Sequence, residues 1–342
     1  MTLWSLPGSH SKQEILIVSD HKPRHFAADL GRFASRADVF LILLAFVIVA
    51  SLASPDFLTA GNIRNLLSQA ALLGVLAIAQ FLVVISGGFD LSVAAVMALA
   101  SVLLARYSGA GLPAAALLGL GAGLVCGLVN GMTVTKGRVQ PLIATLAMMG
   151  IARGLAFTVS QQSILVKLPE LDQIRSWDGF LTVPTIIWLV LVVAATWWCR
   201  GTRQARHAYA VGGNEITARL AGVAADRIKI GIYTAAGTLS GVAGLLLVIR
   251  SGSGVPSVGV GWELDSIAAI VIGGARLFGG EGNLLKAMAG VLIYQLIANI
   301  MNLVGVDPFY QGIVRALVII LAVGLSVLRK TRAEHRQIQG RL

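Results

Sequence analysis

The residues of this sequence that could do chemistry are few, because polar side chains are rare within its long apolar runs. Two carboxylates stand between such runs: Asp90, in the segment 86–92, and Asp265, in the segment 263–269. A charge inside hydrocarbon is costly, so each needs a structural or functional reason. Both precede a short apolar run, and Asp90 also follows two helix-breaking glycines. Each carboxylate could cap the helix after it or take part in gating a transport path, and the sequence leaves both roles open.

Amide side chains within the apolar runs form a second group of candidates. In hydrocarbon such amides most often hydrogen-bond a neighbouring helix, and less often they bind a substrate. We predict that a translocation path or its gate draws on both groups and on Ser92, which lies beside Asp90; the candidates are Asp90, Ser92, Asn130, Asp265, Asn299 and Asn302.

No pattern typical of an enzyme or of a metal site occurs in the sequence. The glycine-rich segment 279–283 lacks the Lys-Ser/Thr ending of a phosphate-binding loop. All five histidines lie in polar segments, and no His, Cys or carboxylate cluster has the spacing of metal ligands. We therefore expect no catalytic residue, no metal site and no cofactor held by this chain.

The polar stretch 200–229 separates two groups of apolar runs and carries a strong excess of basic residues. Within it, residues 213–223 are predicted to form a short helix. Asn214 can cap the first turn, and Glu215 lies where the helix dipole favours an anion. Gly213 precedes this turn and Gly222 lies near the helix end, where glycine is common.

The spacing of Ile216, Leu220 and Val223 predicts that they share one apolar face of this helix. Such a face on the positive side of a membrane protein could seat on a soluble partner. It could equally lie on lipid headgroups, and the spacing alone does not decide between the two.

The composition identifies the class of protein that positions these residues. The chain has 342 residues, of which 56% are hydrophobic and only 13% charged, and its mean hydropathy is +0.81. So few charges could not cover a soluble protein of this size, which indicates a polytopic membrane protein. The net charge of +11 does not indicate a nucleic-acid partner, because the charges cluster between apolar runs. Cys126 and Cys199 lie in apolar stretches and are expected to be packing residues without a disulfide.

About ten apolar runs are long enough to be considered as transmembrane helices, since a span needs about 20 residues. The predicted fold class is therefore an all-α polytopic membrane protein with interrupted helices. The Asp90 and Asp265 segments lie five spans apart, which an inverted repeat of two five-helix halves would explain. The predicted spans are 37–54, 65–86, 90–107, 113–135, 140–159, 182–199, 229–250, 265–280, 285–305 and 309–328.

The basic residues predict the orientation of these spans. With the N-terminus inside, 20 of the 27 Lys and Arg residues fall in inner segments. The positive-inside rule then places both termini and the stretch 200–229 in the cytoplasm. We predict a cytoplasmic segment 1–36, a membrane domain 37–328 and a cytoplasmic tail 329–342.

Glycines at four-residue intervals predict close helix packing. Gly119, Gly123, Gly127 and Gly131 share one helix face, and Gly237 and Gly241 repeat the pattern in a later span. Small residues in this register let two backbones approach closely. We expect packing within the chain, because a dedicated dimer face is the less common use of such a pattern.

Several motifs resemble the permease subunits of ATP-binding cassette importers for monosaccharides, of the ribose-permease type. The motifs run in family order from about residue 60 to 328. They are 87–93, Asn130-Gly131 with 135–146, 209–214, Ala218-Arg219-Leu220 with Gly222, 263–274 and 277–280. Ala94 stands where the family often has Gly, and Ala275-Arg276 where it often has a small-hydroxyl pair. These departures affect details of the pore and of one inner loop.

The resemblance implies a function and a set of partners. It implies a homodimeric permease in the inner membrane, with two cytoplasmic subunits that bind ATP and an extracytoplasmic solute-binding protein. It also implies that the 213–222 segment is the coupling helix seated in the ATPase, with the residues Gly213, Asn214, Glu215, Ile216, Ala218, Arg219, Leu220 and Gly222.

We therefore predict an importer permease that forms the path for a monosaccharide and contacts lipid but no nucleic acid. One alternative is a permease for another small solute, such as a branched-chain amino acid. A second is an ion-coupled secondary transporter, which would need its own ion or proton site in mid-membrane. The first alternative differs in the solute, and the second differs in the energy source.

Overall fold

The computed structural model describes residues 25–177, 179–307, 309–314, 316–317 and 320. The chain divides into two units, Met1–Asp38 and Val39–Leu342. Residues 1–24, the predicted tail 329–342 and most of the last predicted span lie outside the described residues. The domain boundaries predicted from the sequence stay predictions.

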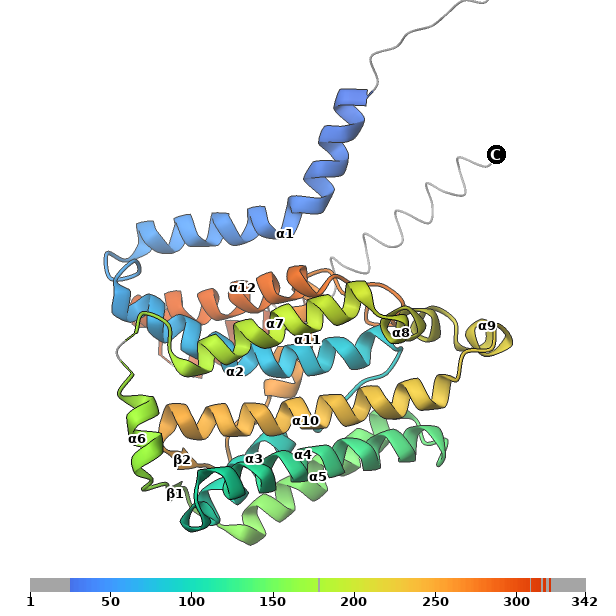
Figure 1. Cartoon of the computed structure of the whole chain (residues 1–342). Helices are drawn as coiled ribbons and strands as arrows, with labels where there is room; N and C mark the ends of the chain where they lie inside the picture. Colours follow the sequence, from blue (N-terminus) through green and yellow to red (C-terminus); the bar gives the residue numbers. More distant parts are fainter. Residues whose placement is uncertain (1–24, 178, 308, 315, 318–319, 321–342) are drawn as a thin grey trace, which may run out of the picture. The chain divides into compact units, whose positions relative to one another are not determined.

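Helices form most of the described chain (Figure 1). A two-residue antiparallel pair, β1 (Ile164–Leu165) with β2 (Ser253–Gly254), joins two loops. The helices are α1 (His25–Ala53), α2 (Ala60–Ile85), α3 (Val93–Arg106), the short 3-10 helix η1 (Ser108–Ala110), α4 (Leu112–Thr135), α5 (Pro141–Val159), α6 (Pro169–Arg175), α7 (Val183–Gly201), α8 (Arg203–Gly213), α9 (Glu215–Leu220), α10 (Ala225–Ser251), α11 (Trp262–Ile272) and α12 (Leu284–Leu303).

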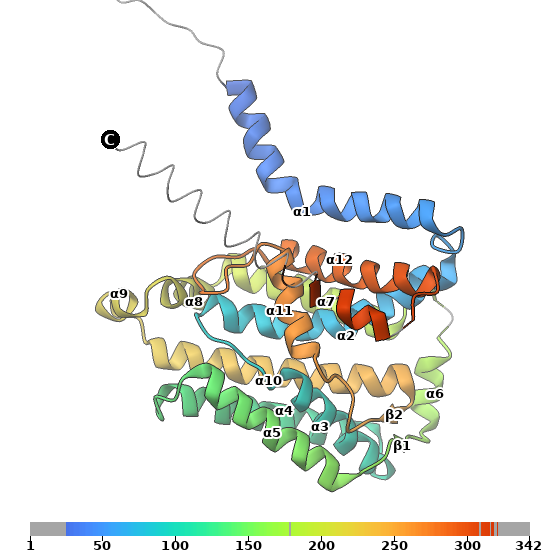
Figure 2. The same ribbon diagram turned by 180° about the vertical axis from the view of Figure 1, so that it is seen from behind.

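The second unit is a bundle of long helices with a different set of connections at each end. One end carries α6 and the strand pair, and the opposite end carries α8 and α9; we call them the α6 end and the α9 end (Figures 1 and 2). Six helices of the described part are long and apolar enough to cross a membrane, namely α2, α4, α5, α7, α10 and α12. The predicted fold class is thus confirmed.

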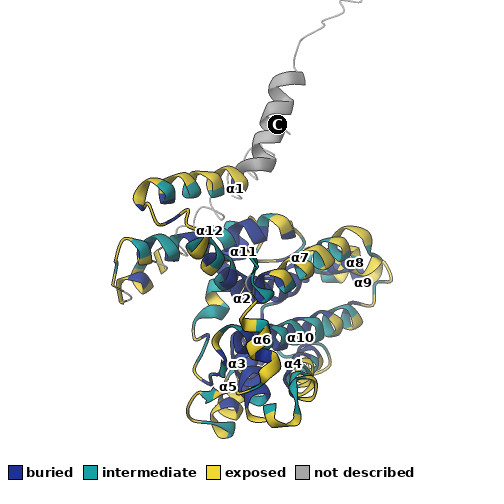
Figure 3. Cartoon of the chain, turned by 60° about the vertical axis from the view of Figure 1, so that its left-hand side comes forward, coloured by how far each residue is buried: buried dark blue, intermediate teal, exposed yellow. Residues whose placement is uncertain are grey.

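Helix α2 forms the centre of this bundle. It contacts α10, α12, α7 and α11, and it is buried along most of its length from Leu66 to Ile85. Its residues are almost all apolar, as expected for a helix that is surrounded on all sides. By contrast, α4, α5 and α7 are exposed along their outer faces (Figure 3), and many of the exposed residues there are apolar. These faces are suited to lipid.

The glycine register of α4 packs within the chain, as predicted. A methyl group at Gly123 or Gly127 would collide with the backbone of α10, and one at Gly237 would collide with Gly123 in return. The two helices therefore touch backbone to backbone, which only small residues permit.

Two predicted spans are shorter in the structure than in the sequence analysis. The run 90–107 contains the 14-residue helix α3, and the run 265–280 contains the 11-residue helix α11, which ends at Ile272. An 11-residue helix rises only about 16 Å, roughly half the hydrocarbon thickness. A turn-rich loop with positive φ at Gly274, Gly279 and Gly280 follows α11, and half of residues 273–280 are glycine, so the helix does not continue through this segment.

Candidate transport path and coupling site

Asp90, Ser92 and Asn130 form one buried cluster, which we call the Asp90 cluster. Asp90 Oδ1 accepts hydrogen bonds from the Ser92 backbone N–H at 2.8 Å and from the Ser92 hydroxyl at 2.6 Å. The Asn130 amide of α4 donates to the Ser92 Oγ at 2.9 Å. All three side chains are about 1% exposed. The structure therefore brings three of the predicted site residues together.

Neighbouring helices hold the segment that carries Asp90. Tyr233 of α10 donates its hydroxyl to the Phe89 carbonyl oxygen at 3.1 Å, and the Leu91 N–H donates to Thr145 Oγ1 of α5 at 3.2 Å. These bonds satisfy backbone groups that the interrupted helix leaves open, which is required at membrane depth. The sequence analysis did not single out Tyr233, because a lone tyrosine in an apolar run has no spacing signal.

The sequence leaves capping open as one of two roles for these carboxylates, and in the structure neither of them is the N-cap residue of the helix after it. Ser92 is the N-cap of α3, and Asp90 lies two residues earlier, where it binds the N–H of Ser92. Gly261 is the N-cap of α11, and Asp265 lies inside its first turns. The Asp265 backbone N–H already donates to the Gly261 carbonyl, and its carboxylate accepts from the Tyr294 hydroxyl. Asp265 is thus not a helix cap.

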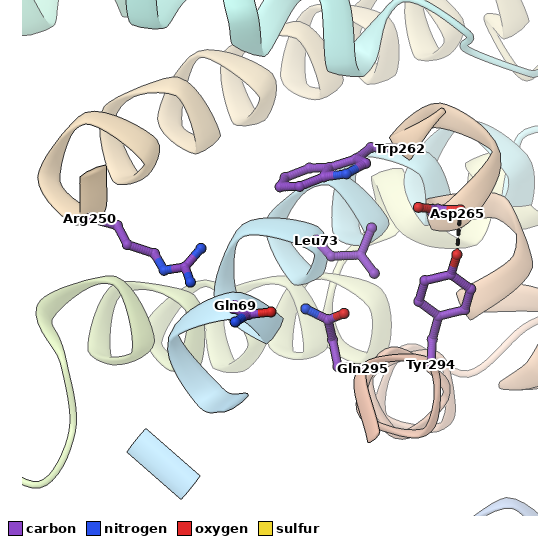
Figure 4. Close-up of a pocket in the computed structure, with 7 residues that line it drawn as sticks. All are labelled: Gln69, Leu73, Arg250, Trp262, Asp265, Tyr294 and Gln295. Atoms are coloured by element: carbon purple, nitrogen blue, oxygen red, sulfur yellow. Dashed lines mark hydrogen bonds between the residues drawn. The ribbon is translucent and has the colours of Figure 1, made fainter. Parts of the chain in front are cut away.

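Asp265 lines a cavity of about 80 Å³ between α2, α10, α11 and α12. Figure 4 shows that the side chains of Gln69, Trp262 and Gln295 point toward a common space in this cavity. An adjoining cavity of about 500 Å³ shares Arg250 with it and includes Gly61, near the start of α2 at the α6 end. We call the first cavity the Trp262 pocket; its lining is Gln69, Leu73, Arg250, Trp262, Asp265, Tyr294 and Gln295.

A cationic side chain fixes the loop that precedes Trp262. Arg153 of α5 donates to the carbonyl oxygens of Pro256 and Val258, at 2.6 Å and 2.8 Å. The loop is also tied to β1 by the strand pair at Ser253 and Gly254. These contacts hold the loop between α10 and α11, which leads from the strand pair at the α6 end to the start of α11.

Asn299 and Asn302 lie apart from the Asp90 cluster and outside the lining of the Trp262 pocket. Asn299 of α12 exchanges two hydrogen bonds with Asn62 of α2, at 2.8 Å and 3.1 Å. Asn302 accepts from the Gln311 amide at 2.8 Å. Both amides therefore bond other amides of the chain, which is the commoner use of such residues in membranes.

The stretch 200–229 contains the short helix predicted there, which is α9. Asn214 is its N-cap, and its side chain accepts from the Thr217 N–H at 2.9 Å. Gly222 follows the helix with a φ of +81°. Gly213 differs from the prediction, since it is the last residue of the preceding helix α8.

The apolar face of α9 is smaller than predicted. Ile216 and Leu220 are 73% and 85% exposed, so they form an apolar pair on the surface. Val223 lies beyond the helix end, where Gly222 reverses the chain, and it packs inward against Ala218 and its neighbours. Val223, seven residues after Ile216, would share the apolar face only if α9 continued beyond Leu220.

Charged residues fasten α9 to the start of α10. Arg219 pairs with Glu215 and Asp226, and Lys229 pairs with Glu215. Burial alone would raise the pKa of Glu215, but hydrogen bonds from Lys229 and Arg219 and their charges lower it below its ordinary value. Glu215 thus stays ionised, and the network holds α9 against α10 as a unit.

Glycine residues join the end of α8 to the end of α2 and to the loop after α11, at a contact that the sequence analysis missed. A methyl group at Gly212 would overlap the Ile85 carbonyl oxygen at the end of α2. The Gly280 N–H donates to that same oxygen at 3.1 Å. We call this contact the glycine junction; it consists of Gly87, Gly212, Gly213, Gly279 and Gly280. The only signal for it in the sequence is three separate Gly-Gly pairs.

Comparison with known proteins identifies the family. The family model described as "Branched-chain amino acid transport system / permease component" matches residues 62–323. The chain belongs to this family. The match includes the Asp90 cluster, the Trp262 pocket and α9, and the resemblance to transport permeases is confirmed.

Named relatives of this permease cover most of its length. The ribose import permease protein RbsC of Escherichia coli K12 is 40% identical over 83% of this chain and 91% of its own. RbsC of Bacillus subtilis is also 40% identical, over 84% and 91%. The L-arabinose transport system permease protein AraH of E. coli K12 is 36% identical over 86% and 90%. No solved structure matches this permease.

Proposed function

We propose that this permease is the membrane subunit of an ATP-binding cassette importer and forms the translocation path for a monosaccharide of the ribose type. The observation that carries the substrate class is the 40% identity to two ribose import permeases along nearly their whole length. The arabinose permease at 36% identity supports a pentose or a related sugar.

The surface of α9 supports an ATPase as the partner that drives transport. Ile216 and Leu220 are exposed apolar side chains on a segment rich in basic residues. A small apolar pair with a charged surround is suited to a groove on a soluble protein. In this proposal two cytoplasmic subunits bind ATP, the permease pairs with a second copy, and an extracytoplasmic protein delivers the sugar. The permease itself binds no cofactor, and the α9 end and both termini lie in the cytoplasm of an inner membrane.

A permease for a branched-chain amino acid is the second candidate, because the matching family model carries that description. Uptake by cells that express the whole transporter separates the two. Labelled D-ribose and L-arabinose should enter, and unlabelled ribose should compete while leucine should not. Uptake of labelled leucine with no uptake of either sugar would contradict the monosaccharide assignment.

A further inference from the structure

We propose that a groove between α7 and α10, at the α9 end of the bundle, is a binding site for an anionic phospholipid. An acyl chain would lie in the groove, and the phosphate would meet Arg227 and Gln204. The inference goes beyond the proposed function and does not rest on it, since it concerns the membrane and not the transported solute. Contact with lipid is expected of any membrane helix, whereas this site would select a negatively charged headgroup.

The groove is a cavity of about 470 Å³, which we call the α7–α10 groove. Helix α7 lines one side through three residues between 194 and 198, and α10 lines the other through five residues between 227 and 235. Leu82 of α2 also lines it, and both outer helices pack on α2 (Figure 1). The groove therefore runs along two membrane helices with a third behind them.

Small residues keep the groove open. Ala194, Ala195 and Ala235 present only methyl groups, and a carbon added at Gly231 would meet nothing within 4 Å. Helices α7 and α10 also contact each other less than either contacts α2. An elongated apolar chain can therefore enter between them, and an acyl chain is the elongated apolar chain that a membrane supplies.

The polar residues of the groove lie at the level of lipid headgroups. Helix α10 has 27 residues, so it rises about 40 Å, more than the hydrocarbon thickness of about 30 Å. Arg227 is the third residue of α10, and Trp198 lies three residues before the end of α7. Tryptophan is enriched at this level of a membrane. The apolar part of the lining, from Ile228 to Ala235, continues toward the middle of the bilayer.

The charge of the groove favours an anion. Arg227 is exposed and forms no ion pair within the described part of the chain, and the adjacent Asp226 pairs with Arg219 instead. Trp198 Nε1 donates to Gln204 Oε1 at 3.4 Å, which leaves the Gln204 Nε2 group to donate to a ligand. The described residues of the lining include no carboxylate. Basic pockets of this kind between membrane helices bind phosphate headgroups.

A lipid in this groove would contact both helices that carry the α8–α9 segment, because α7 leads into α8 and α9 leads into α10. A ligand that binds only the folded chain stabilises it in proportion to its concentration relative to its Kd. Binding at the groove is therefore measurable as a shift in melting temperature.

Melting of the purified full-length permease in detergent tests the headgroup contact. Phosphatidylglycerol, which is anionic, should raise the melting temperature more than phosphatidylcholine with the same acyl chains. Arg227→Gln should need about fivefold more phosphatidylglycerol for the same shift, the factor expected for one basic residue at an anionic headgroup. Arg206→Gln is the matched control, because Arg206 is an exposed arginine of α8 outside the groove lining. Native mass spectrometry counts the phosphatidylglycerol that each variant retains.

Gly231→Leu tests the acyl-chain contact, because its side chain would enter the space proposed for the lipid. The shift that depends on phosphatidylglycerol should be lost. The melting temperature without lipid should stay equal or rise, since a helical glycine is replaced. Gly121→Leu is the matched control and should keep the shift, because a carbon added at this exposed glycine of α4 also meets nothing within 4 Å.

Three results would overturn the site. Equal shifts with both lipids would show no selection of charge, and equal effects of Arg227→Gln and Arg206→Gln would show a diffuse surface charge instead of a site. Loss of a permease dimer in Gly231→Leu would show that a second copy covers the groove. If Gly231→Leu does not fold, the two arginine variants still decide. None of these measurements uses sugar or ATP, so their outcome does not depend on the proposed function.

Discussion

At the scale of single residues, the Asp90 cluster ties the segment between α2 and α3 to the start of α3 and to α4. Asp90 accepts two hydrogen bonds from Ser92, and Ser92 in turn accepts one from Asn130 of α4. The Asp90 carboxylate thus serves as a hydrogen-bond acceptor for Ser92, which Asn130 holds in turn. A group in this role needs an oxygen in the right place, and it does not need to exchange a proton.

Substitution of Asp90 tests this role. Asn keeps one carbonyl acceptor and should retain a large part of the sugar uptake, whereas Ala leaves the Ser92 N–H and hydroxyl without their acceptor. The loss of one such buried bond costs about 1–3 kcal/mol, so Asp90→Ala should lower both the melting temperature and the uptake. Both are measured on purified, reconstituted transporter. Equal loss of uptake in Asn and Ala variants of the same stability would favour a titrating role instead.

At the scale of elements, α8 and α9 connect a surface helix to the interior of the bundle. The ion pairs Glu215–Lys229 and Arg219–Asp226 hold α9 to α10, and the glycine junction holds the end of α8 to the end of α2. The loop after α11 enters the same junction through Gly279 and Gly280. A displacement of α9 would therefore be transmitted to the segment at Gly87, where α2 ends, and to the loop that follows α11.

The exposed leucine of α9 gives the most direct test of partner docking. Leu220→Asp should leave insertion and melting temperature unchanged, because the side chain is 85% exposed in this chain. It should weaken retention of the ATPase subunit by about tenfold or more, since it places an unpaired charge in the contact. Retention is measured by pull-down in detergent. Leu165→Asp is the control, because Leu165 is 64% exposed but lies at the α6 end; equal retention in both variants would contradict docking at α9.

A second element-level prediction concerns the glycine junction. Gly212→Ala forces a methyl group onto the Ile85 carbonyl, so the junction must open, at about 1–3 kcal/mol for an overpacked site. We expect a lower melting temperature and a loss of uptake with continued ATP hydrolysis. Gly213→Ala is the matched control, since the nearest atom to its added carbon would be 3.9 Å away. Similar behaviour of the two variants would argue against a specific contact at Gly212.

At the scale of the whole molecule, the features that the sequence predicted are those that depend on local pattern. The long helices α2, α4 and α5 follow from the apolar runs predicted as spans at 65–86, 113–135 and 140–159, whose length and composition are visible residue by residue. Asn214 was predicted as a cap because the residues that signal a helix start are adjacent in the chain. The glycine register of α4 was predictable for the same reason.

Features that depend on distant contacts were not predictable. The glycine junction joins positions 87, 212 and 280, which no local pattern relates. Gly273, directly after the end of α11 at Ile272, packs against the backbone of α12 at Ala287, a contact that no local pattern indicates. Asp265 accepts a hydrogen bond from Tyr294 of another helix, so only the three-dimensional structure could decide against the capping role that the sequence left open.

The orientation of the molecule is a prediction from charge and can be measured. Single cysteines at Ser163 and Gln204, both exposed, are introduced into a chain without Cys126 and Cys199. A membrane-impermeant thiol reagent added to intact cells should label position 163, at the α6 end, and spare position 204, near α9. After permeabilisation both should react. The opposite pattern would invert the topology and place α9 on the wrong side for an ATPase.

The central claim is that ATP hydrolysis by a partner drives a sugar through this permease, and uptake into sealed vesicles measures it most directly. Vesicles that hold the complete transporter take up labelled ribose with ATP on the α9 side and the binding protein on the α6 side. We predict uptake that needs hydrolysable ATP and continues when an uncoupler collapses the proton gradient at fixed ATP. Uptake that continues without ATP and stops with the uncoupler would contradict the account and indicate an ion-coupled transporter.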